Sequence, residues 1–236
     1  MDANRMQWNQ NLKELRQALK SPANLDRAKQ LFFAVHAPLH ASRVSNTQGW
    51  NLEEELWLGL NEAEFRCIPA GEEHSIAWCL WHLARIEDIT MNVLVADSAQ
   101  VLSQSDWARR LHPPIQDTGN LISPEGVQNL SERIAFADLR AYRSVVGQRT
   151  REIVFQLGSM DIQRKAPAER LQRLLDEGAV LPTTTGLLDY WGKLTVAGLL
   201  LMPPTRHAFI HLTEALKLKK KAQKMVKQSR ENRLLH

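Results

Sequence analysis

SIAWCLWHLARIEDITMN, residues 75–92, is the stretch that decides the fold. On a helix that turns about 100° per residue, Ser75, Trp78, Cys79, Ile86, Ile89 and Val93 lie within about 60° of His82. Most of these side chains are apolar, so this face is expected to be buried. We therefore predict a helix over about 73–96 that points His82 into the core. Glu87 and Asp88 lie about 140° and 120° away on that helix, where we expect them to pair with basic residues or support neighbouring side chains.

A second histidine pair lies far downstream in RHAFIHLTEA, residues 206–215. His207 and His211 are four residues apart, so on a helix they share one face, which Glu214 continues. Two neutral imidazoles on one helical face can chelate a metal ion. A third imidazole from another helix would complete the set, and His82 is the best candidate. Three neutral ligands leave a divalent ion its full charge, so it could polarise a carbonyl or acidify bound water.

Simpler interpretations stay open for each of these residues. A histidine on an apolar face is commonly a core residue that bonds a backbone carbonyl. If Pro203-Pro204 starts a new helix, His207 lies in its first turn, where the helix dipole disfavours a cation; if the prolines only kink a longer helix, that objection weakens. His36 and His40 form a rival pair with Pro38 between them, which we rank lower, as core or surface histidines.

The remaining candidate side chains have weaker patterns. Cys79 is either a ligand or reactive thiol, or a buried and inert side chain, and the second interpretation is favoured. Tyr142, Tyr190 and Trp191 line a pocket or belong to an aromatic core. No pattern connects the remaining histidines to a site, since they lie in a loop, in a connection and at the terminus: His74, His112 and His236.

Helical periodicity dominates the whole chain, and no run shows the strict alternation of a strand. We expect helices over about 4–19, 24–42, 52–60, 73–96, 124–157, 167–176, 186–201 and 204–228. Asn24, Asn51 with Glu54, and Ser123 before Pro124 are the expected N-caps. The predicted class is all-α: a four-helix bundle with extra short helices and a long connection, residues 98–124, between the second and third bundle helices. We expect one domain over 1–216, with its core at about 25–215, and a basic tail over 217–236.

Composition and charge narrow the classes of function. The chain has 236 residues, of which 44% are hydrophobic, and only two cysteines, which favours a reducing cytoplasm over a disulfide framework. No membrane span or secretion signal is expected. Residues 217–233 hold eight Lys or Arg and one Glu, a charge of +7, so the net +4 leaves the other 219 residues at −3. The tail is either a solvated helix end or a partner-binding segment, and it lacks the aromatic residues that would indicate nucleic acid.

Ile76, Trp78 and His82, followed by His207 and His211, resemble the motifs of the DinB-like superfamily, the damage-inducible, YfiT-like metalloenzymes of bacteria. The resemblance implies a four-helix bundle in which one histidine of the first motif and two of the second bind a divalent ion, often zinc or nickel. It also implies a dimer and, in some members, thiol-dependent transferases or isomerases that use mycothiol or bacillithiol, or the bundle domain of ergothioneine-synthesis enzymes. The chain departs from a minimal member in its N-terminal extension, the 98–124 insertion, the helix at 167–176 and the basic tail.

Two classes of function follow. In the first, the protein is a metal-dependent enzyme, a thiol-dependent transferase or a hydrolase, with His82, His207 and His211 on zinc, nickel, iron or cobalt. Glu214 could then orient a ligand or act as a base, and Arg85 could meet an anionic substrate; a surface salt bridge explains either residue equally well. The expected partners are a low-molecular-weight thiol, a small substrate and a second copy of the chain. In the second class, the protein is not a catalyst. Its histidines are structural, or they bind a metal that only holds the helices together, and the basic tail binds a partner.

Overall fold

The computed structural model describes residues 2–234 of the chain, and the side chains of residues 2–227. Within that range the chain is helical, with one isolated antiparallel bridge between Lys165 and Thr195, and the predicted all-α class is confirmed. The α-helices are α1 (Ala3–Ala18), α2 (Leu25–His36), α3 (Ser42–Ser45), α4 (Leu52–Trp57), α5 (Glu62–Arg66), α6 (Ile76–Asp88), α7 (Trp107–Leu111), α8 (Pro124–Arg133), α9 (Phe136–Gln156), α10 (Ala168–Asp176), α11 (Thr185–Lys193), α12 (Val196–Leu201) and α13 (Ala208–Leu234). The 3₁₀ turns are η1 (Pro22–Asn24), η2 (Ala37–Leu39), η4 (Val101–Ser103) and η5 (Pro182–Thr184), and the π-helical segments are η3 (Ile89–Val95) and η6 (Met202–His207).

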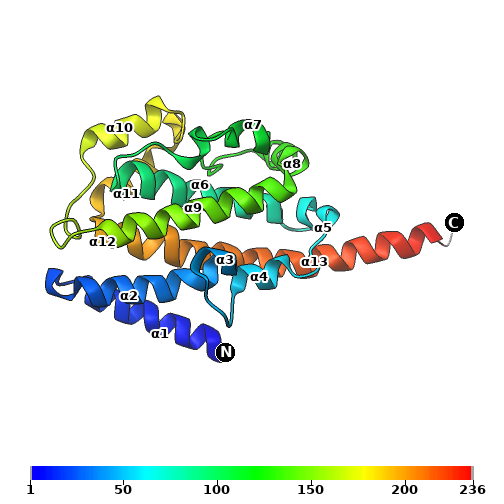
Figure 1. The fold of residues 1–236 in the computed structure, drawn as a ribbon. Helices are drawn as coiled ribbons and strands as arrows, with labels where there is room; N and C mark the ends of the chain where they lie inside the picture. Colours follow the sequence, from blue (N-terminus) through cyan, green and yellow to red (C-terminus); the bar gives the residue numbers. More distant parts are fainter. Residues whose placement is uncertain (1, 235–236) are drawn as a thin grey trace.

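The axes of α2, α6, α9 and α13 are roughly aligned in the molecule (Figure 1). Helix α6 lies against α9 on one side and α13 on the other, and α2 contacts both α9 and η6. Helix α1 packs outside α2, and the short helices α4 and α5 cover α13. This arrangement puts α6 at the centre of the molecule, in contact with the helix that carries the second histidine pair.

Helix α6 forms where the sequence predicts it and is buried along its whole length. Ser75 caps it, since its side chain accepts the amide of Trp78 at 3.0 Å. All thirteen of its residues are buried, which fits its run of large apolar side chains. The helix continues as the π-helical segment η3, where the Thr90 hydroxyl donates to the Ile86 carbonyl at 2.6 Å. His82 is therefore held on a rigid and central element.

Two of the predicted long helices are wrong, because each is interrupted by a backbone bond to a distant segment. The helix expected over 124–157 breaks into α8 and α9 at Ala135, whose amide donates to the Leu111 carbonyl. The helix expected over 186–201 breaks after α11, where the amide of Val196 donates to the Arg164 carbonyl. Asn24 precedes α2 but makes no side-chain capping bond, so that expected cap is also wrong.

The double proline kinks a helical segment and does not start a new helix. Pro203 and Pro204 lack the amide hydrogens that an α-helix needs, and here the chain widens into η6 between α12 and α13. The Thr205 hydroxyl donates to the Leu200 carbonyl at 2.9 Å across this widened turn. His207 therefore lies inside a continuous helical segment, and the objection from the dipole at a helix N-terminus falls away.

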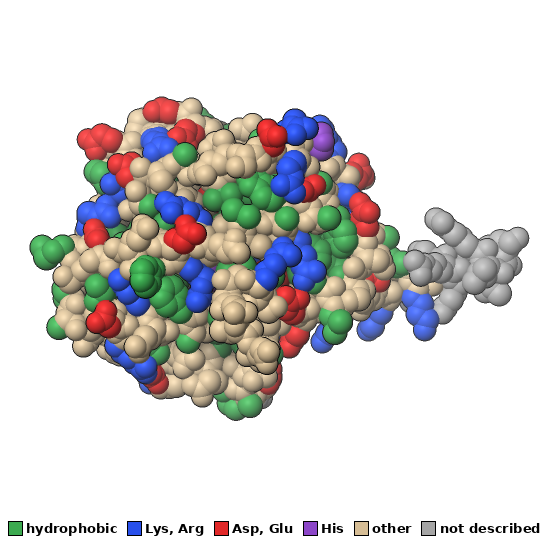
Figure 2. Space-filling view, viewed as in Figure 1, with side chains coloured by type: hydrophobic (Ala, Val, Ile, Leu, Met, Phe, Trp, Pro, Cys, Tyr) green, Lys and Arg blue, Asp and Glu red, His purple; other side chains and the backbone are tan. Residues whose placement is uncertain are grey.

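Helix α13 runs past the body of the molecule toward the C-terminus (Figure 1), without a break at residue 217. Its Lys219 is buried and donates to the carbonyls of Glu55, Leu56 and Leu58 at 2.6–3.0 Å, so it satisfies the end of α4. This basic residue is therefore part of the fold. Figure 2 shows Lys and Arg side chains interleaved with Asp and Glu over the visible face of the molecule. The side chains of 228–236, and His236 entirely, lie outside the described residues.

Across residues 2–234, no helix combines the length and the apolar character that crossing a membrane requires.

Candidate metal centre

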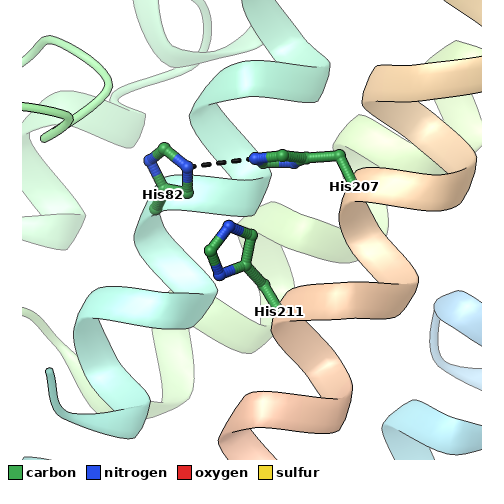
Figure 3. Close-up of side chains that lie close together, drawn as sticks. All are labelled: His82, His207 and His211. Atoms are coloured by element: carbon green, nitrogen blue, oxygen red, sulfur yellow. Dashed lines mark hydrogen bonds between the residues drawn. The ribbon is translucent and has the colours of Figure 1, made fainter. Parts of the chain in front are cut away.

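Three imidazoles converge between α6 and the segment formed by η6 and α13 (Figure 3). His82 comes from the middle of α6, His207 ends η6, and His211 lies one turn later in α13. The ring centroids are 4.9 Å apart for His82 and His207, 4.8 Å for His82 and His211, and 4.6 Å for His207 and His211. One nitrogen from each ring lies within 4.8 Å of the other two. The structure thus brings together the three residues that the sequence selected.

The connection after α6 fixes the orientation of His82. Its Nδ1 donates to the Thr118 carbonyl at 2.7 Å, so its proton is on Nδ1 and its Nε2 carries a free lone pair. The neighbouring carbonyls hold neighbouring side chains of α6: Trp81 Nε1 donates to Asp117 at 3.2 Å and Trp78 Nε1 to Gly119 at 3.3 Å. Residues 117–119 thus form a backbone clamp along α6.

Glu214 fixes the orientation of His211. The carboxylate accepts the Nδ1 proton of His211 at 2.9 Å on one oxygen and that of His74 at 3.1 Å on the other. These two hydrogen bonds, opposed by burial, keep the pKa of Glu214 well below its usual range, so it is ionised. As in His82, the bond on Nδ1 leaves Nε2 of His211 with its lone pair free. A carboxylate that anchors a histidine in this way is typical of metal sites.

His207 is the ring whose tautomer a metal ion would change. Its Nε2 lies 3.1 Å from Nε2 of His82, so His207 is the donor of that hydrogen bond. Its Nδ1 is buried and has no hydrogen-bond partner. A cation bound by both Nε2 atoms would replace this hydrogen bond and move the proton of His207 to Nδ1. One imidazole would thus rearrange, while the other two already offer their lone pairs.

The protonation state of the buried rings fits a divalent ion. Burial, followed by the proximity of His211, lowers the pKa of His82 to about 3. Burial, followed by the proximity of His82 and His211, lowers the pKa of His207 to about 2. These rings are therefore neutral near pH 7, which is the form that binds metals. Trp78 stacks on His82 at 4.7 Å and limits its movement.

The two weaker candidates have other partners. Arg85 is buried and donates to Asp88 at 2.9 Å, Tyr142 at 2.9 Å and Gln100 at 2.5 Å, with its Nε on the Gln116 carbonyl. It therefore faces a structural network beside the centre, with no hydrogen bond to any of the three histidines among those described. Glu214 does adjoin the centre, but both of its oxygens already accept from histidines.

The rival pair forms a second buried cluster with Glu87. His36 Nε2 lies 3.0 Å and His40 Nε2 2.9 Å from separate oxygens of that carboxylate, and all three residues are fully buried. Burial would raise the pKa of Glu87, but the proximity of His40 and the two hydrogen bonds outweigh it, so the pKa lies well below its usual range. Each imidazole therefore donates its Nε2 proton to a carboxylate.

This hydrogen bonding is the reverse of that in the three-histidine centre, although the ligand atoms of the second cluster also lie within 4.8 Å of one another. The Nδ1 atoms of His36 and His40 are buried without partners. To bind a metal through Nε2 beside Glu87, both rings would have to move a proton to Nδ1, which has no acceptor. The cluster is thus better suited to join α2 to α6 than to hold an ion, which agrees with the core interpretation.

Sequence reasoning missed His74 and was right in part about the other candidates. His74 looked unconnected, yet it bonds Glu214 and stacks on Trp78 at 3.5 Å. Cys79 is buried, as favoured, with a pKa raised well above its usual value by burial and then by Glu214, and it lies beside His211 and Glu214. Tyr142 belongs to the core, whereas Tyr190 and Trp191 line a cavity that includes His207.

Comparison with known proteins identifies the family of this chain. The sequence profile of the DinB superfamily matches residues 46–214, which include the three converging histidines and Glu214 but exclude His36 and His40. A search of curated proteins found no match. Because the profile covers more than half of the chain, the chain belongs to the DinB superfamily.

Proposed function

We propose that this member of the DinB superfamily binds one divalent metal ion through His82, His207 and His211 and uses it in a transferase or hydrolase reaction on a small molecule. The hydrogen bonding of the rings supports the ion most directly. Thr118 and Glu214 hold the Nδ1 protons of His82 and His211, so two lone pairs already face a common point. A bound ion would supply Lewis-acid activation of water, a thiol or a carbonyl.

The remaining residues would orient and enclose the site. Trp78 lies beneath the imidazole of His82 and edge-on to His211, and so excludes water from that side. His207 is only partly buried and borders a cavity, which would give a substrate an approach to the centre. That approach favours catalysis over a purely structural ion, since structural metal sites are closed on all sides.

We further propose a low-molecular-weight thiol as a co-substrate. Three neutral ligands leave a divalent ion with its whole positive charge, which favours an anionic thiolate as an additional ligand. Zinc, nickel and iron all suit imidazole ligands, so availability would decide between them. The buried thiol of Cys79, whose pKa is raised by burial and by Glu214, is unsuited to replace an external thiol.

Metal analysis of untagged protein tests the ion. After incubation with zinc or nickel and dialysis, we expect about one equivalent per chain. His82→Ala and His211→Ala should each lose it, whereas His112→Ala, on an exposed loop residue, should retain it. An untagged protein that binds no ion, or one that binds equally well in His82→Ala and His211→Ala, would contradict the proposal.

A reaction assay then distinguishes a catalytic ion from an ion that only stabilises the helical bundle. The metal-loaded protein is incubated with a small thiol and a chromogenic aryl halide, so that a thiolate sulfur displaces the halide. We expect loss of the accelerated rate in metal-free protein and in His211→Ala. If the ion raises the melting temperature but accelerates neither this displacement nor ester hydrolysis, the metal is structural.

A further inference from the structure

A small cavity of about 160 Å³ opens beside His207, apart from the larger grooves of the surface. Its inner wall is formed by Ile86 of α6, Trp191 of α11 and Pro203 of η6, all of which are buried. A larger hollow, of about 980 Å³, lies instead between residues 42–59 and Arg140 and contains none of the three histidines. The small cavity, by contrast, reaches the candidate centre through His207.

The lining of this cavity is mostly apolar and carries no charged side chain. Leu187 and Met202 form its half-buried sides. Its residues with polar groups are Asn120 and Tyr190, which are both exposed, together with Trp191 and His207. A charged group that binds against such a wall loses contact with water, and no opposite charge in the lining compensates for that loss. The lining thus selects an uncharged, apolar group.

The volume of the cavity limits the size of that group. An apolar cavity of about 150 Å³ accommodates benzene. The cavity beside His207 is of that size, so it fits one aromatic ring or a compact branched aliphatic group, with any larger part of the molecule left at the rim between Asn120 and Tyr190.

The walls are held in place by contacts that do not depend on an ion. Asn120 follows the clamp of residues 117–119, whose carbonyls bond side chains of α6. Trp191 lies on α11, which packs on α10, and the break after Lys193 is fixed by the bond from Val196 to Arg164. The cavity is therefore expected to exist in the metal-free protein as well.

We propose that this cavity binds the compact, uncharged apolar part of a small-molecule substrate, a benzene-sized ring or a branched aliphatic group, and holds it against the His207 side of the centre. The chemistry at the centre rests on the proposed function, but the binding of the apolar group does not. The proposed reaction at the metal and the proposed binding in the cavity can therefore be disproved separately.

Methyl NMR of the metal-free full chain tests this proposal, with toluene as the probe and benzoate and benzylammonium as charged probes of similar size. We expect toluene to shift the methyl signals of Ile86, Leu187 and Met202. The charged probes should bind at least tenfold more weakly. The experiment needs no substitution. Absence of toluene shifts at these methyls, or equal binding of all three probes, would overturn the proposal.

A filled cavity provides the second measurement. Leu187→Trp should abolish the toluene shifts of Ile86 and Met202, whereas Leu121→Trp, at an exposed leucine outside the lining, should leave them unchanged. Toluene binding that persists in a folded Leu187→Trp protein would also overturn the proposal. His211 does not line the cavity, so His211→Ala should keep toluene binding while it loses the ion. Toluene binding without any metal binding would refute the proposed function alone.

Discussion

Each imidazole of the centre is fixed by a different kind of partner. His82 is held by a backbone carbonyl, His211 by the carboxylate of Glu214, and His207 by the hydrogen bond that it donates to His82. A backbone carbonyl cannot be changed by substitution, and His207 has no partner on Nδ1. Glu214 is therefore the residue at which the support of the centre can be tested separately from its ligands.

Glu214→Gln should weaken metal binding without removing a ligand. The amide oxygen can accept one imidazole proton, but the amide nitrogen cannot accept the other, so the orientation of His211 or His74 is lost. Loss of such a support costs about 10- to 100-fold in metal affinity. Competition with a chromogenic chelator measures it, with Glu152→Gln on the exposed face of α9 as the control. Unchanged affinity in Glu214→Gln would show that the carboxylate has no such role.

Substitution of Glu87 should lower the stability of the protein and leave metal binding intact, in contrast to Glu214→Gln. Glu87→Ala leaves the Nε2 protons of His36 and His40 buried without an acceptor, and each unsatisfied buried donor destabilises a protein by about 1–3 kcal/mol. Urea unfolding of metal-free protein would measure the loss. At a temperature where the variant stays folded, it should still bind one ion at the three histidines, and loss of that ion would instead place Glu87 in the metal site.

At the residue scale, the sequence predicted the three histidines but not their supports. His207 and His211 are paired by helical spacing and His82 by its apolar face, while the superfamily resemblance joined the two segments. Thr118 acts through its carbonyl, which every residue has, and no side-chain pattern could have indicated it. His74 precedes α6 in a loop, so no helical spacing connected it with Glu214.

At the element scale, the clamp of residues 117–119 is the least expected part of the structure. The connection looked like an irregular insertion, yet its carbonyls bond Trp81, His82 and Trp78 in order. A helix whose apolar side chains recur with helical spacing, such as α6, was predicted at the correct place in the chain. The breaks between α8 and α9 and between α11 and α12 were missed, because distant backbone groups cause them.

Gly119 makes the clamp possible, so Gly119→Ala should disturb it. Its φ is +72°, a conformation that other residues rarely adopt, and an added Cβ would lie 3.2 Å from Nε1 of Trp78. We expect a loss of about 1 kcal/mol or more in stability and weaker metal binding, because the adjacent Thr118 carbonyl would shift. Gly178→Ala has a similar φ of +64° but open space around it and lies outside the centre, so it should lose stability alone. Equal metal affinity in both variants would contradict the role of the clamp.

At the scale of the whole molecule, buried neutral histidines make the stability depend on pH. The pKa is lowered to about 4 for His36, about 3 for His82 and about 2 for His207, with burial as the largest cause in each. Between pH 6.5 and 4.5 the unfolded chain therefore binds protons that the folded chain does not, and stability falls as the pH falls. Each histidine contributes about 1.4 kcal/mol per pH unit at most in that window.

Urea unfolding of the metal-free protein at pH 7.5, 6.0 and 5.0 would measure this slope. His82→Gln should reduce it by up to the contribution of one histidine, because that group no longer titrates in the unfolded state. A stability that stays constant over this range, or that rises toward pH 5, would show that these imidazoles are not held neutral in the fold.

The position of a bound ion tests the central claim most directly. Anomalous diffraction from crystals of the untagged protein loaded with zinc or nickel locates that position. We predict a single strong peak about 2.0–2.1 Å from a nitrogen each of His82, His207 and His211. A peak between His36, His40 and Glu87 in its place, or no ordered ion at saturating metal, would contradict the account.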